Sequence, residues 1–192
     1  EVKALFALSN SLGSPFVRAL DIFANTKGRV IVSGMGKSGH IGNKIAATLA
    51  STGTPSFFVH PAEASHGDLG MITEHDSLLA LSNSGETPEL ADIVSYAARF
   101  KIPLVAITAV ADSTLSKAAD AALMLPDSPE ACPMGLAPTT SSTMMLALGD
   151  AMAVALLERR KFSLADFKEL HPGGKLGQRL MKVAEIMHIG NE

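Results

Sequence analysis

Short, wholly apolar runs alternate with longer segments of helical composition through most of the 192-residue chain. Runs without a polar residue at every second position are typical of strands that are buried on both faces of a sheet. The segments between them, such as 37–51 and 88–100, have the composition of helices that cover those faces. The pattern therefore predicts an α/β fold, a three-layer αβα sandwich around a parallel sheet. The five expected strands are Arg29–Ser33, Ser56–Val59, Leu78–Leu81, Leu104–Thr108 and Ala122–Leu125.

Helices are expected at both ends of this pattern. Residues 1–25 carry apolar side chains at loosely helical spacing, and Pro15 is expected to break or kink the segment. After the last strand, a long helix rich in Ala, Met and Leu is expected from about Ser141 to Arg160. Its apolar residues extend around the helix, so we expect part of it to lie between copies of the chain. Its apolar stretch is too short to span a bilayer.

Composition narrows the range of partners. Hydrophobic residues make up 47% of the chain and charged residues 18%, which fits the packed core of one domain. The net charge of -3 and the absence of a long basic run argue against nucleic acid or an anionic membrane. No signal peptide is visible and Cys132 is the only cysteine, so we expect a cytoplasmic protein. A small anion remains a candidate ligand, because a few amides and cations can bind it locally.

A glycine-rich loop directly follows the first expected strand, with the sequence Gly34-Met35-Gly36-Lys37-Ser38-Gly39-His40. Its glycines permit a tight turn, and the helix after it offers amides to an anion. The spacing also matches the dinucleotide pattern GxGxxG, which requires an acid at the end of the second strand. That strand ends instead at Val59-His60, and a P-loop fails because Ile31 stands where its first glycine would be. The loop is a candidate phosphate site, with a turn shaped only for packing as the alternative.

Hydroxyl side chains gather in two further loops. The segment Ser82-Asn83-Ser84-Gly85-Glu86-Thr87-Pro88-Glu89 follows the third strand and leads into a helix, so it offers a nest of donors to a phosphate. Ordinary capping explains one of these hydroxyls but not several together. Before the long helix, capping and anion binding explain Thr139-Thr140-Ser141-Ser142-Thr143 about equally well. Because ligands bind at the carboxyl ends of parallel strands, all three loops are expected at one edge of the sheet.

The order of the motifs resembles that of one family. The set comprises Gly34–His40, His66–Gly70, Ser82–Glu86, Glu130–Thr139 and His171–Gly177. It resembles the SIS domain of arabinose 5-phosphate isomerases, from about Gly28 to His188. The serine-rich loop alone is typical of any SIS domain. The Glu-Ala-Cys-Pro and His-Pro-Gly-Gly segments are similar to this isomerase group in particular.

The resemblance implies a fold, an activity and a domain plan. It implies the SIS fold, which is flavodoxin-like, assembled into a homotetramer. It also implies an aldose–ketose isomerase without a cofactor that interconverts D-ribulose 5-phosphate and D-arabinose 5-phosphate through an enediol. This reaction is the first step toward Kdo in lipopolysaccharide or capsule. Residues 1–188 would form the SIS domain, and residues 189–192 would begin the linker to CBS domains that are absent here.

The resemblance also assigns roles to matching positions. The substrate phosphate is expected among Ser38, Ser82, Asn83, Ser84 and Thr87. The physical interpretation agrees, because these residues flank two expected helix starts at the same sheet edge.

Four residues match the catalytic set of the family: Lys37, Glu89, Glu130 and His171. Either Glu89 or Glu130 would move the proton between C1 and C2, a task that suits a pKa near neutrality. Lys37 would stabilise the enediolate, and His171, reaching in from a neighbouring subunit, would open the ring or relay hydroxyl protons. For the acids, the plainer alternatives are a solvated carboxylate at a helix start and an exposed loop acid. For His171, the alternative is a residue that only shapes a turn.

His66 and Cys132 need separate interpretations. His66 has His60, Glu63 and His75 nearby in the sequence, but structural zinc usually takes four ligands that include cysteine. We therefore expect His66 at the rim of the site, binding substrate or an inhibitory metal and not a catalytic one. Cys132 is expected to be a buried apolar residue, because isomerisation needs no covalent intermediate.

Other functions remain open. A non-catalytic phosphosugar-binding module of a regulator would use the same loops, although no helix-turn-helix with a basic face is visible. Another SIS enzyme, acting on heptose or hexulose phosphates, is disfavoured by the two specific segments. A nucleotide-dependent oxidoreductase is weakened by the missing ribose acid.

Overall fold

Five parallel strands in the order β2-β1-β3-β4-β5 form the centre of the protein. The computed structural model describes residues 1–172 and 187. Every strand that the apolar runs predict is present, with each end within one residue of the expected position. Their bounds are β1 Val30–Gly34, β2 Ser56–Phe58, β3 Ser77–Leu81, β4 Leu104–Thr108 and β5 Ala121–Met124.

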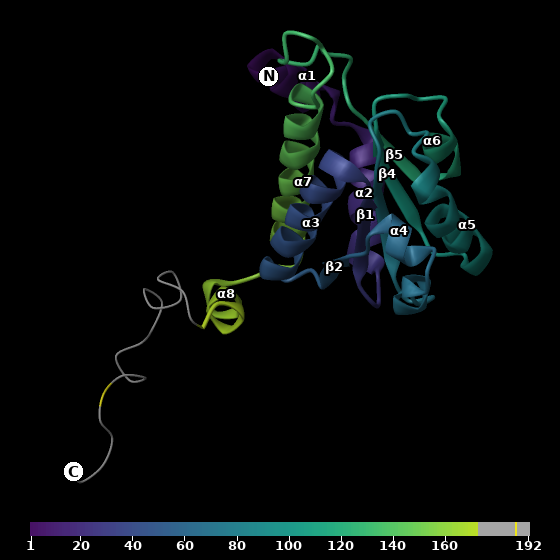
Figure 1. Cartoon of the computed structure of the whole chain (residues 1–192). Coiled ribbons are helices and arrows are strands. Elements are labelled where there is room, and N and C mark those ends of the chain that lie inside the picture. The colour runs from purple at the N-terminus through teal and green to yellow at the C-terminus, as the bar shows by residue number, and fades with distance from the viewer. Residues whose placement is uncertain (173–186, 188–192) are drawn as a thin grey trace.

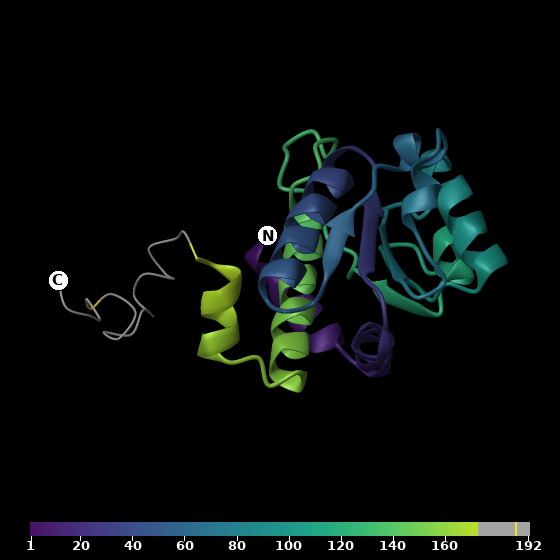
Figure 2. The ribbon, with the colours of Figure 1, turned by 90° about the horizontal axis from the view of Figure 1, so that it is seen from below.

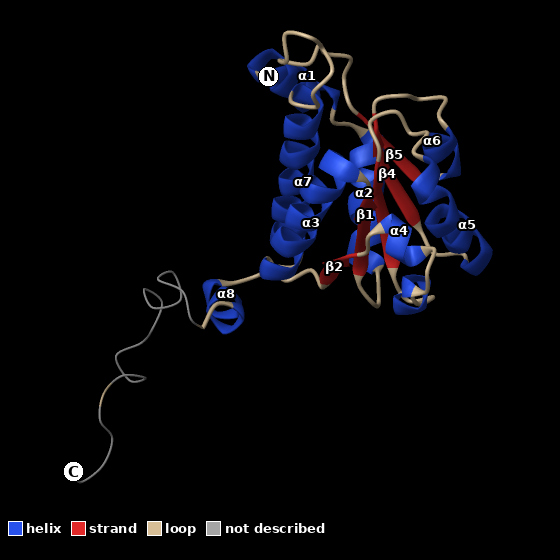
Figure 3. Ribbon diagram, viewed as in Figure 1, coloured by secondary structure: helices blue, strands red, loops and turns tan. Residues whose placement is uncertain are grey.

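Helices cover both faces of the sheet, as Figures 1 and 3 show. One face packs against α1 (Val2–Ser11), α2 (Ser14–Asn25), α3 (Gly36–Ser51) and α7 (Thr140–Arg159). The other face packs against α4 (Pro61–Ala64), α5 (Ala91–Phe100) and α6 (Thr114–Ala118), with the 3-10 turns η1 (Asp68–Met71) and η2 (Pro88–Leu90) at this side. The predicted three-layer αβα sandwich is therefore confirmed.

Alternate residues of each strand enter the two cores. In β1, Val30 and Val32 belong to the core under α3 and α7, whereas Ile31 belongs to the core under α5. All three side chains are fully buried. Both faces of the strand are therefore apolar, which explains why the sequence shows continuous runs instead of alternation.

The N-terminal segment forms two helices. The break falls at Leu12–Gly13, and Pro15 lies in the first turn of α2, where its missing amide costs nothing. The expectation that Pro15 itself breaks or kinks a helix is therefore wrong: Pro15 lies at the start of the second helix and not at the break.

The long helix α7 lies in the core of the protomer. Nine of its residues are buried, and Lys44 of α3 forms an ion pair with Asp150 of α7. The expectation that this stretch is too short to span a bilayer is wrong, because α7 is long and apolar enough to do so by length and composition. Half of its most apolar window is nevertheless buried inside the protein. The sequence predicted that part of this apolar helix lies between copies of the chain. Most of its apolar surface is instead covered within one protomer, although Val154 is 55% exposed.

The strand order creates a switch point between β1 and β3. The chain leaves β1, passes through α3 to β2 at one edge, and returns to the other side of β1 to form β3. The loops after β1 and β3 therefore diverge to opposite faces of the sheet at its carboxyl edge. In open α/β sheets this divergence leaves the crevice in which ligands bind.

Candidate active site

The start of α3 lies at this switch point. Lys37 is the second residue of α3 and is exposed, while Ser38 is half-buried. Met35 precedes the helix and gives no side-chain hydrogen bond to its first amides. The amides at the N-terminus of α3 thus lack a side-chain cap, and the positive end of its dipole lies at the carboxyl edge.

Ser82 and Thr87 close the loop that follows β3. Ser82 Oγ lies 2.7 Å from Thr87 Oγ1 and accepts a hydrogen bond of 3.0 Å from the Gly85 amide. Ser82 is only 2% exposed, whereas Asn83 and Ser84 are exposed. The structure thus divides the predicted phosphate set: Ser82 and Thr87 shape the loop, and Asn83 and Ser84 face outward.

Gly85 fixes how this loop packs. Its φ of +67° lies in the left-handed region, and a Cβ there would lie 2.1 Å from Ser113 Oγ. Ser113 is buried and its hydroxyl accepts a hydrogen bond from the Ser116 amide, which caps α6. Only glycine meets both requirements, so the loop rests directly on the start of α6.

Glu86 makes a structural contact that the sequence does not reveal. Its carboxylate accepts hydrogen bonds from the Thr114 amide at 2.7 Å and from Thr114 Oγ1 at 2.8 Å. These bonds lower the pKa of Glu86. The helix-start signal at Ser113-Thr114 is visible in the sequence, but no local pattern connects it to an acid 28 residues earlier. Glu86 anchors the loop to α6.

Lys37 and Glu89 are the least engaged charged groups of the candidate set. Glu89 lies in η2 and is exposed, as Lys37 is. Neither side chain makes a hydrogen bond or ion pair with another residue in the described part of the chain. A cation and a carboxylate are therefore available beside the two loops, as chemistry on a bound anion requires.

Glu130 is held by hydrogen bonds, in contrast to Glu89. Its Oε2 atom accepts hydrogen bonds from the Thr139 amide at 2.7 Å, from Thr139 Oγ1 at 3.0 Å and from the Ser141 amide at 3.3 Å. Partial burial alone would raise the pKa of Glu130, but bonds from the Ser141 side chain and from these amides outweigh it and lower the pKa to about 2. The carboxylate caps the N-terminus of α7.

His171 lies away from the other candidates within one protomer. It follows α8 (Leu164–Leu170), where its ring stacks on Phe167 at 3.9 Å and its Nδ1 atom lies 2.8 Å from the Phe167 carbonyl oxygen. Phe162, just before α8, packs against Gly53 beyond the last turn of α3. Figures 1 and 2 show α8 beside this far end of α3 and α7. Action of His171 in a neighbouring subunit stays a prediction, and Gly173–Gly177 lie outside the described residues.

His66 is exposed in the turn between α4 and η1. Within residues 1–172 and 187, no group of three or more His, Cys, Asp and Glu side chains could hold a metal ion. The structure therefore offers no described cluster for the metal that the sequence suggests, and a role of His66 at the rim of the site stays a prediction.

Cys132 differs from expectation. It is half-buried and not a fully buried apolar residue. Backbone amides of Ala137, Leu136 and Met134 point toward the sulfur and lower its pKa. The loop backbone curls around the thiol, so polar contacts determine its environment as much as packing does.

Three buried hydroxyls remain without a hydrogen-bond partner among the described residues, and two of them, on Ser33 and Thr140, belong to elements of the candidate site. Ser33 Oγ belongs to the penultimate residue of β1, and Thr140 Oγ1 belongs to the first residue of α7. Both lie toward the carboxyl edge. The sequence does contain a feature that could have singled out Ser33: it is a hydroxyl residue at the end of an otherwise apolar strand, directly before the glycine-rich loop.

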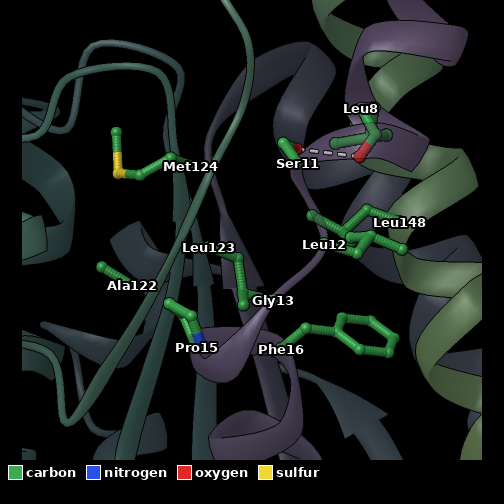
Figure 4. A pocket seen from close by; sticks show the side chains of 10 residues that line it. All are labelled: Leu8, Ser11, Leu12, Gly13, Pro15, Phe16, Ala122, Leu123, Met124 and Leu148. Carbon is green, nitrogen blue, oxygen red and sulfur yellow. Dashed lines mark hydrogen bonds between the residues drawn. The ribbon is translucent and has the colours of Figure 1, made fainter.

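An apolar pocket of about 170 Å³ lies elsewhere, between the α1–α2 turn, β5 and α7 (Figure 4). Leu8, Leu12, Phe16 and Leu148 line it, and the one hydroxyl in its wall, Ser11 Oγ, donates to the Leu8 carbonyl oxygen at 2.8 Å. With no other polar side chain in its lining, this pocket does not suit an anion.

The class of protein follows from the fold and is supported by comparison. The SIS domain family model matches residues 22–155, so the chain belongs to the SIS domain family. A protein of Escherichia coli CFT073, solved in complex with arabinose 5-phosphate, superimposes with a TM-score of 0.86 and 43% identity. That match covers 89% of this chain and 91% of the other.

Within the family, this chain is similar to arabinose 5-phosphate isomerase KdsD. The protein of that name from Pseudomonas aeruginosa is 56% identical over 191 residues, or 99% of this chain. The one from Yersinia pestis is 53% identical over 193 residues. The chain spans 59% of the length of each of these curated relatives.

Proposed function

We propose that this domain catalyses the interconversion of D-ribulose 5-phosphate and D-arabinose 5-phosphate through an enediol. Identity of 56% to an arabinose 5-phosphate isomerase, spread over nearly the whole chain, supports this reaction. So does the likeness to a structure that holds arabinose 5-phosphate. One observation carries the proposal: Lys37 and Glu89 lie beside the two loops at the switch point that could bind a phosphate. Neither side chain is paired with another described residue.

The phosphate would bind between the loops after β1 and β3. The start of α3 has no side-chain cap, so its amides can bind an anion there. Ser38, Asn83 and Ser84 add polar side chains, while Ser82 and Thr87 hold the second loop in shape. This arrangement fixes one end of the sugar phosphate and leaves its C1 and C2 atoms to the charged groups.

The proton transfer then requires one base. We assign Glu89 to remove the proton from C2 of the aldose and return it to C1, which gives the ketose. The positive charge of Lys37 would stabilise the enediolate between these steps. His171 of a neighbouring copy would open the ring or relay the hydroxyl proton, and its stacking on Phe167 of α8, outside the two loops, is compatible with that role.

The remaining parts of the proposal concern the assembly and its setting. We propose a homotetramer that needs no metal or organic cofactor, binds neither nucleic acid nor membrane, and acts in the cytoplasm. The product would enter the synthesis of Kdo for lipopolysaccharide or capsule. The similarity to isomerases named KdsD supports this setting.

A substrate panel tests the reaction directly. The 192-residue chain is incubated with pentose and hexose phosphates in heavy water, and products are followed by NMR. We expect turnover of arabinose 5-phosphate and ribulose 5-phosphate, with deuterium entering at the exchanged carbon. Turnover of another sugar phosphate in preference to these two would overturn the proposed substrate. Thermal stabilisation by pentose phosphates without turnover would favour a non-catalytic binding module instead.

A further inference from the structure

One carboxylate ties together the two ends of the loop between β5 and α7. Glu130 Oε2 accepts from the amide and hydroxyl of Thr139 at 2.7 and 3.0 Å, and from the Ser141 amide at 3.3 Å. The tie is reciprocal, because the Ala131 amide donates to Thr139 Oγ1 at 2.9 Å. The loop from 130 to 139 is therefore closed at its base by side-chain contacts.

The same carboxylate replaces the ordinary cap of α7. Thr139 occupies the N-cap position of this helix but forms no side-chain cap hydrogen bond there. Glu130, nine residues upstream, accepts from the first amides instead. Removing Glu130 would therefore release the helix start and the loop base together.

Near its tip, the loop that Glu130 closes is held mainly by contacts within itself, between Cys132 and the backbone of residues 134–137. The Gly135 amide donates to the Cys132 carbonyl oxygen at 2.8 Å, which forms a turn at the tip. Met134 and Leu136 are 76% and 78% exposed, so packing within the protomer does not hold them. The position of the tip depends on how firmly the base is tied.

A base that transfers a proton must have an accessible lone pair and must accept a proton there. Three donors already converge on Oε2 of Glu130, so a proton on that oxygen would break contacts that α7 depends on, and a proton on Oε1 would remove the charge that strengthens these bonds. Glu89, by comparison, is exposed and unpaired among the described residues.

We propose that Glu130 is a positioning residue, which ties the 130–139 loop to the start of α7 at the edge of the active site, and that it does not transfer the substrate proton. This inference rests on the proposed isomerase function. The lowered pKa of Glu130, about 2, is consistent with it, because such a carboxylate is a weak base at neutral pH.

Paired substitutions at both ends of the tie separate the two roles. Glu130→Gln keeps an acceptor oxygen, so we expect its kcat to stay within about tenfold of wild type. The acid limb of the pH profile of kcat/KM should stay at the same pH. Glu130→Ala and Thr139→Ala both break the tie and should lower kcat by similar factors, on the order of ten- to a hundredfold. Thr139→Ser, which retains the hydroxyl, should restore activity.

Ser142→Ala is the matched control, because Ser142 Oγ lies in the same turn but, among residues 1–172 and 187, bonds only to the Pro138 and Thr139 carbonyl oxygens. Amide hydrogen exchange at Thr139 and Ser141 gives a readout that does not need activity. Exchange should rise in Glu130→Ala and Thr139→Ala but not in Glu130→Gln or the control.

A loss of about a thousandfold or more in Glu130→Gln, with both amides still protected, would overturn the inference and make Glu130 the base. If the wild-type chain turned over no pentose phosphate, the proposed function would fail by itself. The exchange data would then still decide whether the tie exists, because unchanged exchange in Glu130→Ala would refute it.

Discussion

Glu89 and Glu130 are carboxylates near helix starts at the same edge of the sheet, yet their surroundings differ in every respect. Glu89 lies in the 3-10 turn before α5, exposed and without a partner among the described residues. Glu130 is half-buried and accepts three hydrogen bonds from Thr139 and Ser141 through one oxygen. One acid is available to a ligand, and the other is part of the framework.

The contrast teaches that residue type and motif position do not determine the role of a carboxylate. A carboxylate that accepts several hydrogen bonds from amides is held in its charged form, because protonation would forfeit those bonds. That environment keeps the pKa of Glu130 at about 2 and suits a permanent structural anion. Proton transfer needs a group that gains and loses its proton near the working pH.

The largest expected effect is that of Glu89→Gln. Removing the proposed base should lower kcat by about a thousandfold, within the range found for general bases, while the fold stays intact. Asp92→Asn, an exposed acid in the first turn of α5, is the control and should retain activity. A Glu89→Gln variant that turned over arabinose 5-phosphate at a near-normal rate would remove the functional contrast between the two acids.

The loops themselves can be compared through Gly85 and Gly135, which share a φ of +67°. Alanine at Gly135 meets nothing within 4 Å, so we expect a cost of about 1 kcal/mol from the strained backbone alone. Alanine at Gly85 collides with buried Ser113 as well and should cost roughly 3 kcal/mol, with weaker phosphate binding. Urea unfolding of both variants measures the difference, and equal costs would contradict the close packing of the Gly85 loop.

The smallest effect concerns acid stability. A folded-state pKa below the ordinary value of 4.5 means that Glu130 stabilises the protein above that pH and loses this contribution as pH falls toward about 2. Because Glu130 is partly exposed, solvent weakens this contribution. The free energy of unfolding of wild type should exceed that of Glu130→Gln by about 1 kcal/mol at pH 7. We expect the gap to close toward pH 2. Thermal unfolding across this range checks it, and a gap that did not depend on pH would argue against the hydrogen-bonded carboxylate.

The sequence by itself determined the sheet, because wholly apolar strands and the helices between them are local patterns of burial. It also located the two loops at the switch point and the residues Lys37 and Glu89 within them. These features depend on neighbours a few positions apart, so periodicity and spacing were sufficient to find them.

Only the tertiary structure decided which polar groups are engaged. It turned Ser82 inward to Thr87, joined Glu86 to Thr114 at a distance of 28 residues, and placed Glu130 on the start of α7. It also stacked His171 on Phe167 of α8, a helix that lies beside the far end of α3 and α7. The physical reason is that hydrogen bonds depend on where the folded backbone carries each group, and no local pattern records that path.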